Sequence, residues 1–203
     1  EHIDQKNEKE IRKYIEESER YRRVFPEVEP DPSQKWNDHE LFIKRSGFSK
    51  DPSIQAWGVT ASGIGGRADV LIFDDPINQR NAILEPESRA RIISIVRETW
   101  MSRIDNPAPN VEIDYPQCIW IATVWHELDA TVAYVMQEKE LFSVLKQSIN
   151  HERTAIDCDL DGGGRKWTIP LWEEKWNTSA LLKKMSALGP RGFSRGFENR
   201  PFS

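Results

Sequence analysis

The feature that most constrains the fold is an apolar run that ends in two acidic residues and a proline. Val70-Leu71-Ile72-Phe73 is continuously apolar and is followed by Asp74-Asp75-Pro76. An apolar strand without alternating polar residues is typical of a parallel sheet that is covered on both faces. The sequence therefore predicts a buried parallel strand here, with two carboxylates at its C-terminal end.

Further strands and helices alternate along the middle of the chain. Cys118–Thr123 and Phe142–Ile149 are two more apolar runs of strand length. Apolar residues recur at helical spacing before and after the first of these runs, in Ile93, Val96, Trp100 and Ile104 and then in Leu128, Val132, Val135 and Met136. Strands that alternate with helices predict an α/β domain with a parallel sheet and right-handed crossovers.

The two ends of the chain differ from this middle. Residues 5–25 predict a charged helix, because acidic residues lie four positions before arginines in Glu8/Arg12, Glu16/Arg20 and Glu19/Arg23. The proline-rich residues 26–53 predict an irregular connector. Residues 178–188 predict a last helix, capped by Thr178 and ended by Gly189-Pro190.

We expect a domain boundary near Cys158. Residues 1–157 would form one α/β domain, and residues 158–203 a small helical and irregular appendage that leads toward a further domain. A chain of 203 residues is long enough for this arrangement.

Composition excludes several classes of protein. The chain has 28 Lys and Arg against 33 Asp and Glu, for a net charge of −5. Its apolar runs are far shorter than the ~20 residues of a membrane helix, and residues 1–30 are too charged for a secretory leader. Cys118 and Cys158 predict neither a zinc site nor a disulfide framework. We therefore expect no membrane partner and a reducing, cytoplasmic compartment.

Two strand ends carry side chains suited to nucleotide hydrolysis. Asp74 and Asp75 end one strand, and Thr123 ends the next. Ligands of open α/β sheets bind outside the carboxyl ends of the strands. One carboxylate can hold Mg²⁺ there, while the second orients the attacking water. A plain Asp-Pro turn that only ends the strand is the alternative interpretation.

A metal-dependent hydrolase or nuclease is a second functional hypothesis for the same residues. Asp74 and Asp75 would bind Mg²⁺ or Mn²⁺ together with His126 or Asp129, since hard cations favour clustered carboxylates. Asp129 also fits the N-cap of the following helix. A histidine such as His126 more often makes a local hydrogen bond than it binds a metal.

Taken in order, these segments resemble the large subunit of viral DNA-packaging terminases. The resemblance runs over nearly the whole chain, including residues 19–26, 172–182 and 193–201. It is carried mainly by Ala68-Asp69-Val70-Leu71-Ile72-Phe73-Asp74-Asp75-Pro76-Ile77, Glu87-Ser88-Arg89 and Ala122-Thr123-Val124-Trp125-His126-Glu127-Leu128-Asp129.

The resemblance implies part of a P-loop NTPase domain of the ASCE type, with ATP and Mg²⁺ as cofactors. Asp74 matches the Mg²⁺-coordinating Walker B acid, Asp75 the catalytic carboxylate and Thr123 the motif that couples hydrolysis to motion. Arg67, in the glycine-rich turn before the strand, is similar in place to an arginine that some of these motors offer to a neighbouring subunit's nucleotide.

The family also implies partners and a location. The expected partners are double-stranded DNA, the terminase small subunit, the portal and procapsid, and further copies of the chain in a ring. The expected location is the cytoplasm of a bacterial host cell.

The sequence departs from the family pattern in three respects. Val124 stands where many relatives have Arg, and Asp75 is one methylene shorter than the more general Glu. The chain has no Gly-x-x-x-x-Gly-Lys-Ser/Thr motif, which in the family lies upstream of this stretch, as a nuclease domain lies downstream. We therefore expect a piece of a longer protein, beginning at Glu1 without an initiator Met and hydrolysing ATP poorly alone. An inactive prophage remnant is a further hypothesis.

Overall fold

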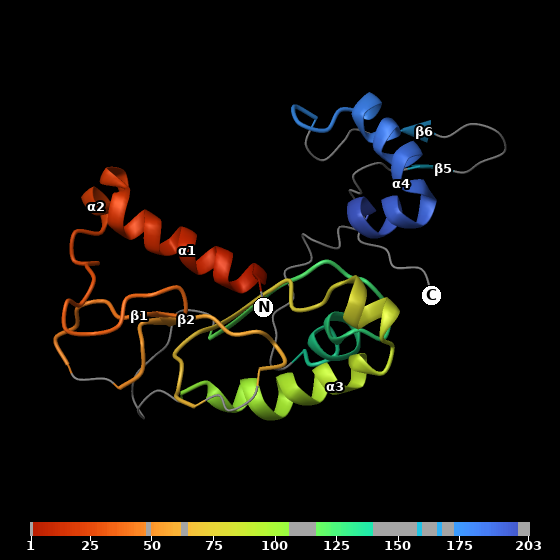
Figure 1. Cartoon of the computed structure of the whole chain (residues 1–203). Helices are drawn as coiled ribbons and strands as arrows, with labels where there is room; N and C mark the ends of the chain where they lie inside the picture. The colour runs from red at the N-terminus through yellow and green to blue at the C-terminus, as the bar shows by residue number, and fades with distance from the viewer. Residues whose placement is uncertain are drawn as a thin grey trace. The chain divides into compact units, whose positions relative to one another are not determined.

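The computed structural model has two compact units, Glu1–Ala68 and Asp69–Ser203, each built of helices and small sheets (Figure 1). It describes residues 2–47, 50–61, 65–105, 117–139, 158–159, 166–167 and 173–198. The boundary predicted near Cys158 adjoins segments outside these ranges and stays a prediction. In the part of the chain that the structure describes, no helix combines the length and the apolar composition that a bilayer crossing requires.

The first unit begins with two helices rather than the single helix predicted over residues 5–25. Helix α1 covers His2–Glu17 and α2 covers Glu19–Val24. The break falls at Ser18, whose hydroxyl oxygen accepts a hydrogen bond from the Tyr21 amide at 3.2 Å. A serine in this role satisfies an amide that a new helix would leave unpaired, so it favours a fresh start over continuation.

The connector that follows contains a small antiparallel sheet. Strand β1, Glu40–Leu41, pairs with β2, Ile54–Gln55, and Leu41 is fully buried. Single bridges join Pro30 to Ile43 and Trp36 to Leu41. The connector is therefore more ordered than its prolines predicted, because they lie outside the two short paired segments.

The second unit is organised around two parallel strands. Strand β3, Leu71–Asp74, pairs in register with β4, Cys118–Ile121. This confirms the predicted parallel pairing of the two apolar runs. The third predicted strand, Phe142–Ile149, lies outside the described residues.

Helical segments connect and follow these strands. Between them come η1, Arg80–Leu84; α3, Ser88–Ile95; η2, Val96–Trp100; and η3, Met101–Arg103. After β4 comes η4, Thr131–Val135. The segments η1, η2 and η4 are π-helical turns, as in the bond from the Met136 amide to the Thr131 carbonyl at 3.0 Å. The predicted helical stripes are confirmed, with wider turns than periodicity alone would indicate.

One face of the β3–β4 pair carries the core of this unit. Phe73 is buried, and its ring lies 4.8 Å from that of Trp120 and 6.3 Å from that of Trp100, centroid to centroid. On the opposite face Ile72 is 64% exposed and Ile121 53% exposed. The apolar run predicted a sheet covered on both faces, whereas the described residues cover one.

The C-terminal part of the unit contains a two-residue strand pair and a long helix. Strand β5, Cys158–Asp159, pairs antiparallel with β6, Lys166–Trp167. Helix α4 covers Thr178–Glu198, but Gly189 within it has a non-helical backbone, with φ of 70° and ψ of 168°, so two helices meet there. The predicted end of the first helix at Gly189-Pro190 is confirmed. Its first turn is capped by Asn177, whose side-chain oxygen accepts from the Ala180 amide at 3.0 Å, and not by Thr178 as predicted.

Candidate active site

The parallel register brings the ends of β3 and β4 to one edge of the sheet. Asp74 lies opposite Ile121, and the Asp75 amide donates to the Ile121 carbonyl at 2.9 Å. Asp74 and Asp75 are exposed, and Thr123 follows two residues beyond Ile121 and is half-buried. The three residues predicted to act on a nucleotide therefore come from two adjacent strand ends.

Asp75 has an unusual backbone conformation. Its φ of 46° places it in the left-handed region, and it is the one non-glycine residue with positive φ within the described ranges. Aspartate tolerates this region better than most residues, but the conformation still costs on the order of 1 kcal/mol. The chain thus turns sharply out of the sheet immediately after Asp74, at the edge where ligands of such sheets bind.

The loop after Asp75 is held by two asparagines. The Asn78 side-chain oxygen accepts from the amides of Arg80 at 3.0 Å and Asn81 at 3.1 Å. The Asn81 side chain donates to the Pro76 carbonyl at 3.1 Å and accepts from the Asn78 amide at 2.8 Å. Sequence reasoning missed these positioning residues, although two asparagines three positions apart after a proline are a recognisable turn signal.

Asp129 organises the segment after β4. It is fully buried, and one carboxylate oxygen accepts from the amides of Trp125 at 2.8 Å and His126 at 3.0 Å. The other accepts from the Val132 amide at 3.1 Å. The expected N-cap role is confirmed, and the cap also fixes the turn that carries Thr123 into the next helix.

His126 makes the local hydrogen bond that the sequence suggested. Its Nδ1 accepts from the Leu128 amide at 3.0 Å. His126 and Asp129 were the additional ligands of the metal-hydrolase hypothesis, and both are engaged with backbone amides. That hypothesis stays a prediction, with no observation in the described structure that favours it.

Side-chain contacts connect β4 to the helix after it. The Trp120 indole N–H donates to the Thr131 hydroxyl at 3.1 Å, which joins β4 to η4. Arg97 on η2 contacts the other end of η4 and the turn after it, with its guanidinium 4.8 Å from the Tyr134 ring centroid and 3.0 Å from Glu138. The segment after β4 is therefore held by contacts from both β4 and η2.

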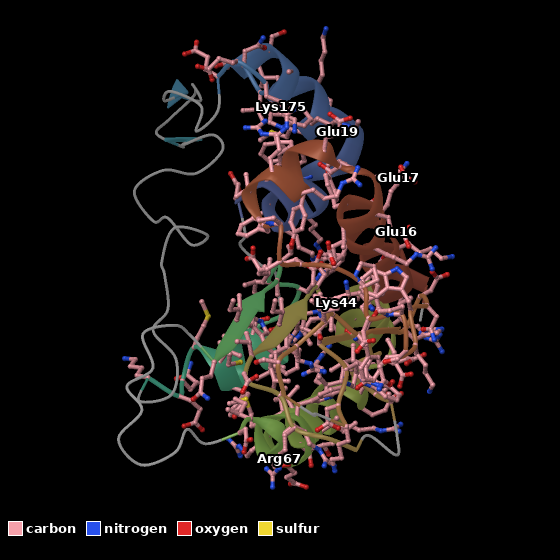
Figure 2. All side chains as sticks on the ribbon, turned by 90° about the vertical axis from the view of Figure 1, so that its left-hand side faces the viewer. Glu16, Glu17, Glu19, Lys44, Arg67 and Lys175 are labelled. Atoms are coloured by element: carbon pink, nitrogen blue, oxygen red, sulfur yellow. The ribbon has the colours of Figure 1, made fainter. Side chains whose placement is uncertain are left out.

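Arg67 lies in the first unit, whereas the two aspartates lie in the second. Its amide donates to an Asp51 carboxylate oxygen at 3.4 Å (Figure 2 labels Arg67). The preceding Gly66 has φ of 95°, and a Cβ there would lie 2.8 Å from the other Asp51 carboxylate oxygen. Only glycine fits this turn without strain. The proposed contact of Arg67 with a neighbouring subunit's nucleotide stays a prediction.

A hollow of about 390 Å³ opens in the first unit. Its lining includes Lys35, Lys50, Asp51, Gln55 and Trp57. None of these residues was predicted to be functional, and the hollow belongs to a different unit from the ends of β3 and β4. We do not assign the nucleotide chemistry to it.

The donor set at the sheet edge fits magnesium bound together with a nucleotide. Mg²⁺ is usually held by one or two carboxylates, with phosphates and water completing its shell. Asp74 and Asp75 supply such carboxylates. Among the residues that the structure describes, no group of three or more His, Cys, Asp or Glu side chains could hold a metal by itself.

Cys118, at the start of β4, is not a candidate nucleophile. Burial raises the pKa of its thiol to about 11, so the thiol is neutral at neutral pH. The reactive form of cysteine is the thiolate. Cys118 therefore serves packing.

Comparison with models of known protein families gives no match for this chain, and comparison with curated proteins gives none either.

Proposed function

We propose that this chain is part of the ATPase domain of a terminase large subunit, which hydrolyses Mg·ATP to drive double-stranded DNA into a viral procapsid. The observation that carries the proposal is the pairing of β3 with β4. Asp74 lies opposite Ile121 and the Asp75 amide bonds to the Ile121 carbonyl. Thr123 follows Ile121 by two residues, so the order of these residues agrees with the motifs that the sequence resembles and supports the proposal.

Each of the three residues has a distinct task in the proposed reaction. Asp74 would hold Mg²⁺, which supplies charge neutralisation at the phosphates when it is bound. Asp75 would orient the attacking water and accept a proton from it. Thr123 would hydrogen-bond that water or the terminal phosphate and so sense whether the phosphate is present.

The surroundings of Asp75 and Thr123 support preorganisation of this site. The Asn78 and Asn81 hydrogen bonds hold the loop after Asp75, and Asp129 holds the turn after Thr123. Catalytic groups fixed before the reaction need less reorganisation at the transition state. The Trp120–Thr131 hydrogen bond joins β4, which precedes Thr123, to the following helix.

The assembly proposed with this function follows from the resemblance. The chain would act with the terminase small subunit and the portal of the procapsid in the cytoplasm of a bacterial host. In a ring of identical subunits, Arg67 would contact the nucleotide of a neighbouring copy.

ATP turnover by the longer protein that includes these residues and an upstream phosphate-binding loop tests the proposal. We expect Mg²⁺-dependent hydrolysis, with kcat lowered on the order of 10²–10³-fold in Asp75→Asn, because the attacking water loses its base. Asp69→Asn is the matched control, since Asp69 is exposed and precedes the same strand. It should keep the turnover of the unmodified protein.

Two results would contradict the proposal. One is full turnover in Asp75→Asn. The other is a parent reading frame without any phosphate-binding loop, which would favour an inactive remnant.

A further inference from the structure

Glu8 on α1 is a buried acidic residue without a partner. It is 1% exposed, and neither carboxylate oxygen has a hydrogen-bond partner. An ionised carboxylate in such a place would lose its hydration without gaining a hydrogen bond to replace it. The neutral, protonated form is therefore favoured while Glu8 stays buried.

The charges near Glu8 add to this effect. Asp38 and Glu40 are the acidic neighbours from the segment that α1 packs against, and burial together with their charges raises the pKa of Glu8 to about 7. The neighbouring cations are bound to other carboxylates. Lys9 and Arg12 contact Asp38 at 3.1 and 2.7 Å, and Lys35 contacts Glu40 at 2.8 Å.

Glu8 lies within the contact between α1 and the segment that leads into β1. The Arg12–Asp38 ion pair joins the two, and so does the Trp36 indole N–H, which donates to Glu16 at 2.6 Å (Glu16 is labelled in Figure 2). Asp38 and Glu40 belong to the same segment, which pairs with β2 at Glu40–Gln55. Ionisation of Glu8 would therefore add a negative charge beside those of Asp38 and Glu40.

We propose that α1 is docked on the segment 36–41 by a proton-dependent contact, held while Glu8 is protonated and weakened when Glu8 ionises. The proposal is independent of nucleotide chemistry, because the residues that carry it all lie in the first unit.

The raised pKa of Glu8 sets the direction in which pH changes the docking of α1. The docked pKa of about 7 is above the ordinary value of 4.5, so the docked state binds more protons. Docking is strongest below pH 4.5, the ordinary pKa of a glutamate. It weakens as the pH rises, until the pH has passed the pKa of about 7 that Glu8 has in the docked state. Between about pH 5.5 and pH 8.5 the docking equilibrium should weaken about 30-fold.

Hydrogen exchange of the α1 amides, corrected for the intrinsic pH dependence of exchange, measures this docking. We expect the unmodified chain to lose about 30-fold in protection between about pH 5.5 and pH 8.5. Glu8→Gln should abolish the loss, because the amide keeps the shape of the neutral acid and does not ionise. Glu10→Gln is the matched control on an exposed position of the same helix and should behave as the unmodified chain.

His39 lies between Asp38 and Glu40, so it needs its own control. His39→Gln should retain the loss of protection. A loss that persists in Glu8→Gln and disappears in His39→Gln would overturn the proposal.

Direct titration of Glu8 by carbon-13 NMR keeps the test decisive if a variant fails to fold. A midpoint near 7 in the unmodified chain is expected. A midpoint near the ordinary value, or protection that does not change with pH, would overturn the proposal.

Discussion

At the residue scale, the segment that follows β4 depends on one side chain. Asp129 satisfies the amides of Trp125, His126 and Val132 from a fully buried position. A carboxylate that accepts from several backbone amides is worth more than a neutral acceptor. The turn that presents Thr123 is therefore only as well ordered as this network.

Replacing Asp129 by Asn should destabilise the protein by about 2 kcal/mol, because the side-chain amide has one acceptor oxygen and turns an N–H toward a backbone donor. Urea denaturation followed by circular dichroism measures the change. Glu127→Gln, on an exposed neighbouring position, should change stability by less than about 0.5 kcal/mol. Equal effects of the two substitutions would show that the hydrogen bonds of Asp129 contribute little.

Single residues also show how far the sequence alone could lead. The roles of Asp129 and His126 were predictable, because a cap and a local turn bond involve residues only a few positions apart. The burial of Glu8 was not, since its helical neighbour Arg12 was expected to pair with it and instead contacts Asp38, 26 positions away. The spacing of residues along one helix does not show which distant carboxylates compete for the same arginine.

At the scale of secondary-structure elements, the two faces of the β3–β4 pair differ. Phe73 packs between Trp100 and Trp120 on one face, whereas Ile72 is largely exposed on the other. An apolar run indicates that both faces suit burial, but it does not indicate how much of the chain covers each face. The parallel pairing of β3 with β4 agrees with the parallel sheet that the sequence predicted, whereas the described residues cover only one face of this pair.

This difference between the faces predicts different costs for two neighbouring substitutions. Phe73→Ala should destabilise the second unit by about 3–5 kcal/mol, because it leaves a cavity between two indole rings. Ile72→Ala should cost less than about 1 kcal/mol, since most of its side chain is already in water. Thermal unfolding of both variants measures the contrast, and similar losses of stability would contradict the observed packing.

The helices show a second limit of periodicity. The stripe from Ile93 to Ile104 was recognised as helical, and the structure has α3, η2 and η3 in succession over residues 88–103. In the π-helical η2 each backbone hydrogen bond spans five residues, one more than in an α-helix. Apolar spacing at three or four residues is compatible with both helix types, so it could not separate them.

At the scale of the whole molecule, the chain divides between Ala68 and Asp69. Composition gives no sign of this division, because Arg67-Ala68-Asp69 leads directly into the apolar residues of β3. Asp74 and Asp75, proposed to act on the nucleotide bound by their own chain, belong to the second unit. Arg67, proposed to contact the nucleotide of a neighbouring copy of the chain, belongs to the first unit. The α1 contact proposed to depend on protonation belongs to the first unit, and the residues proposed for hydrolysis belong to the second.

In the proposed function, the shared edge of β3 and β4 binds magnesium together with a nucleotide. Calorimetric titration of ADP, in Mg²⁺ and in EDTA, into a longer protein that includes these residues and a phosphate-binding loop measures this binding. Mg²⁺ should tighten ADP binding at least about tenfold, and Asp74→Asn should remove that gain while Asp69→Asn retains it. An Asp74→Asn variant that keeps the full magnesium dependence would contradict the account.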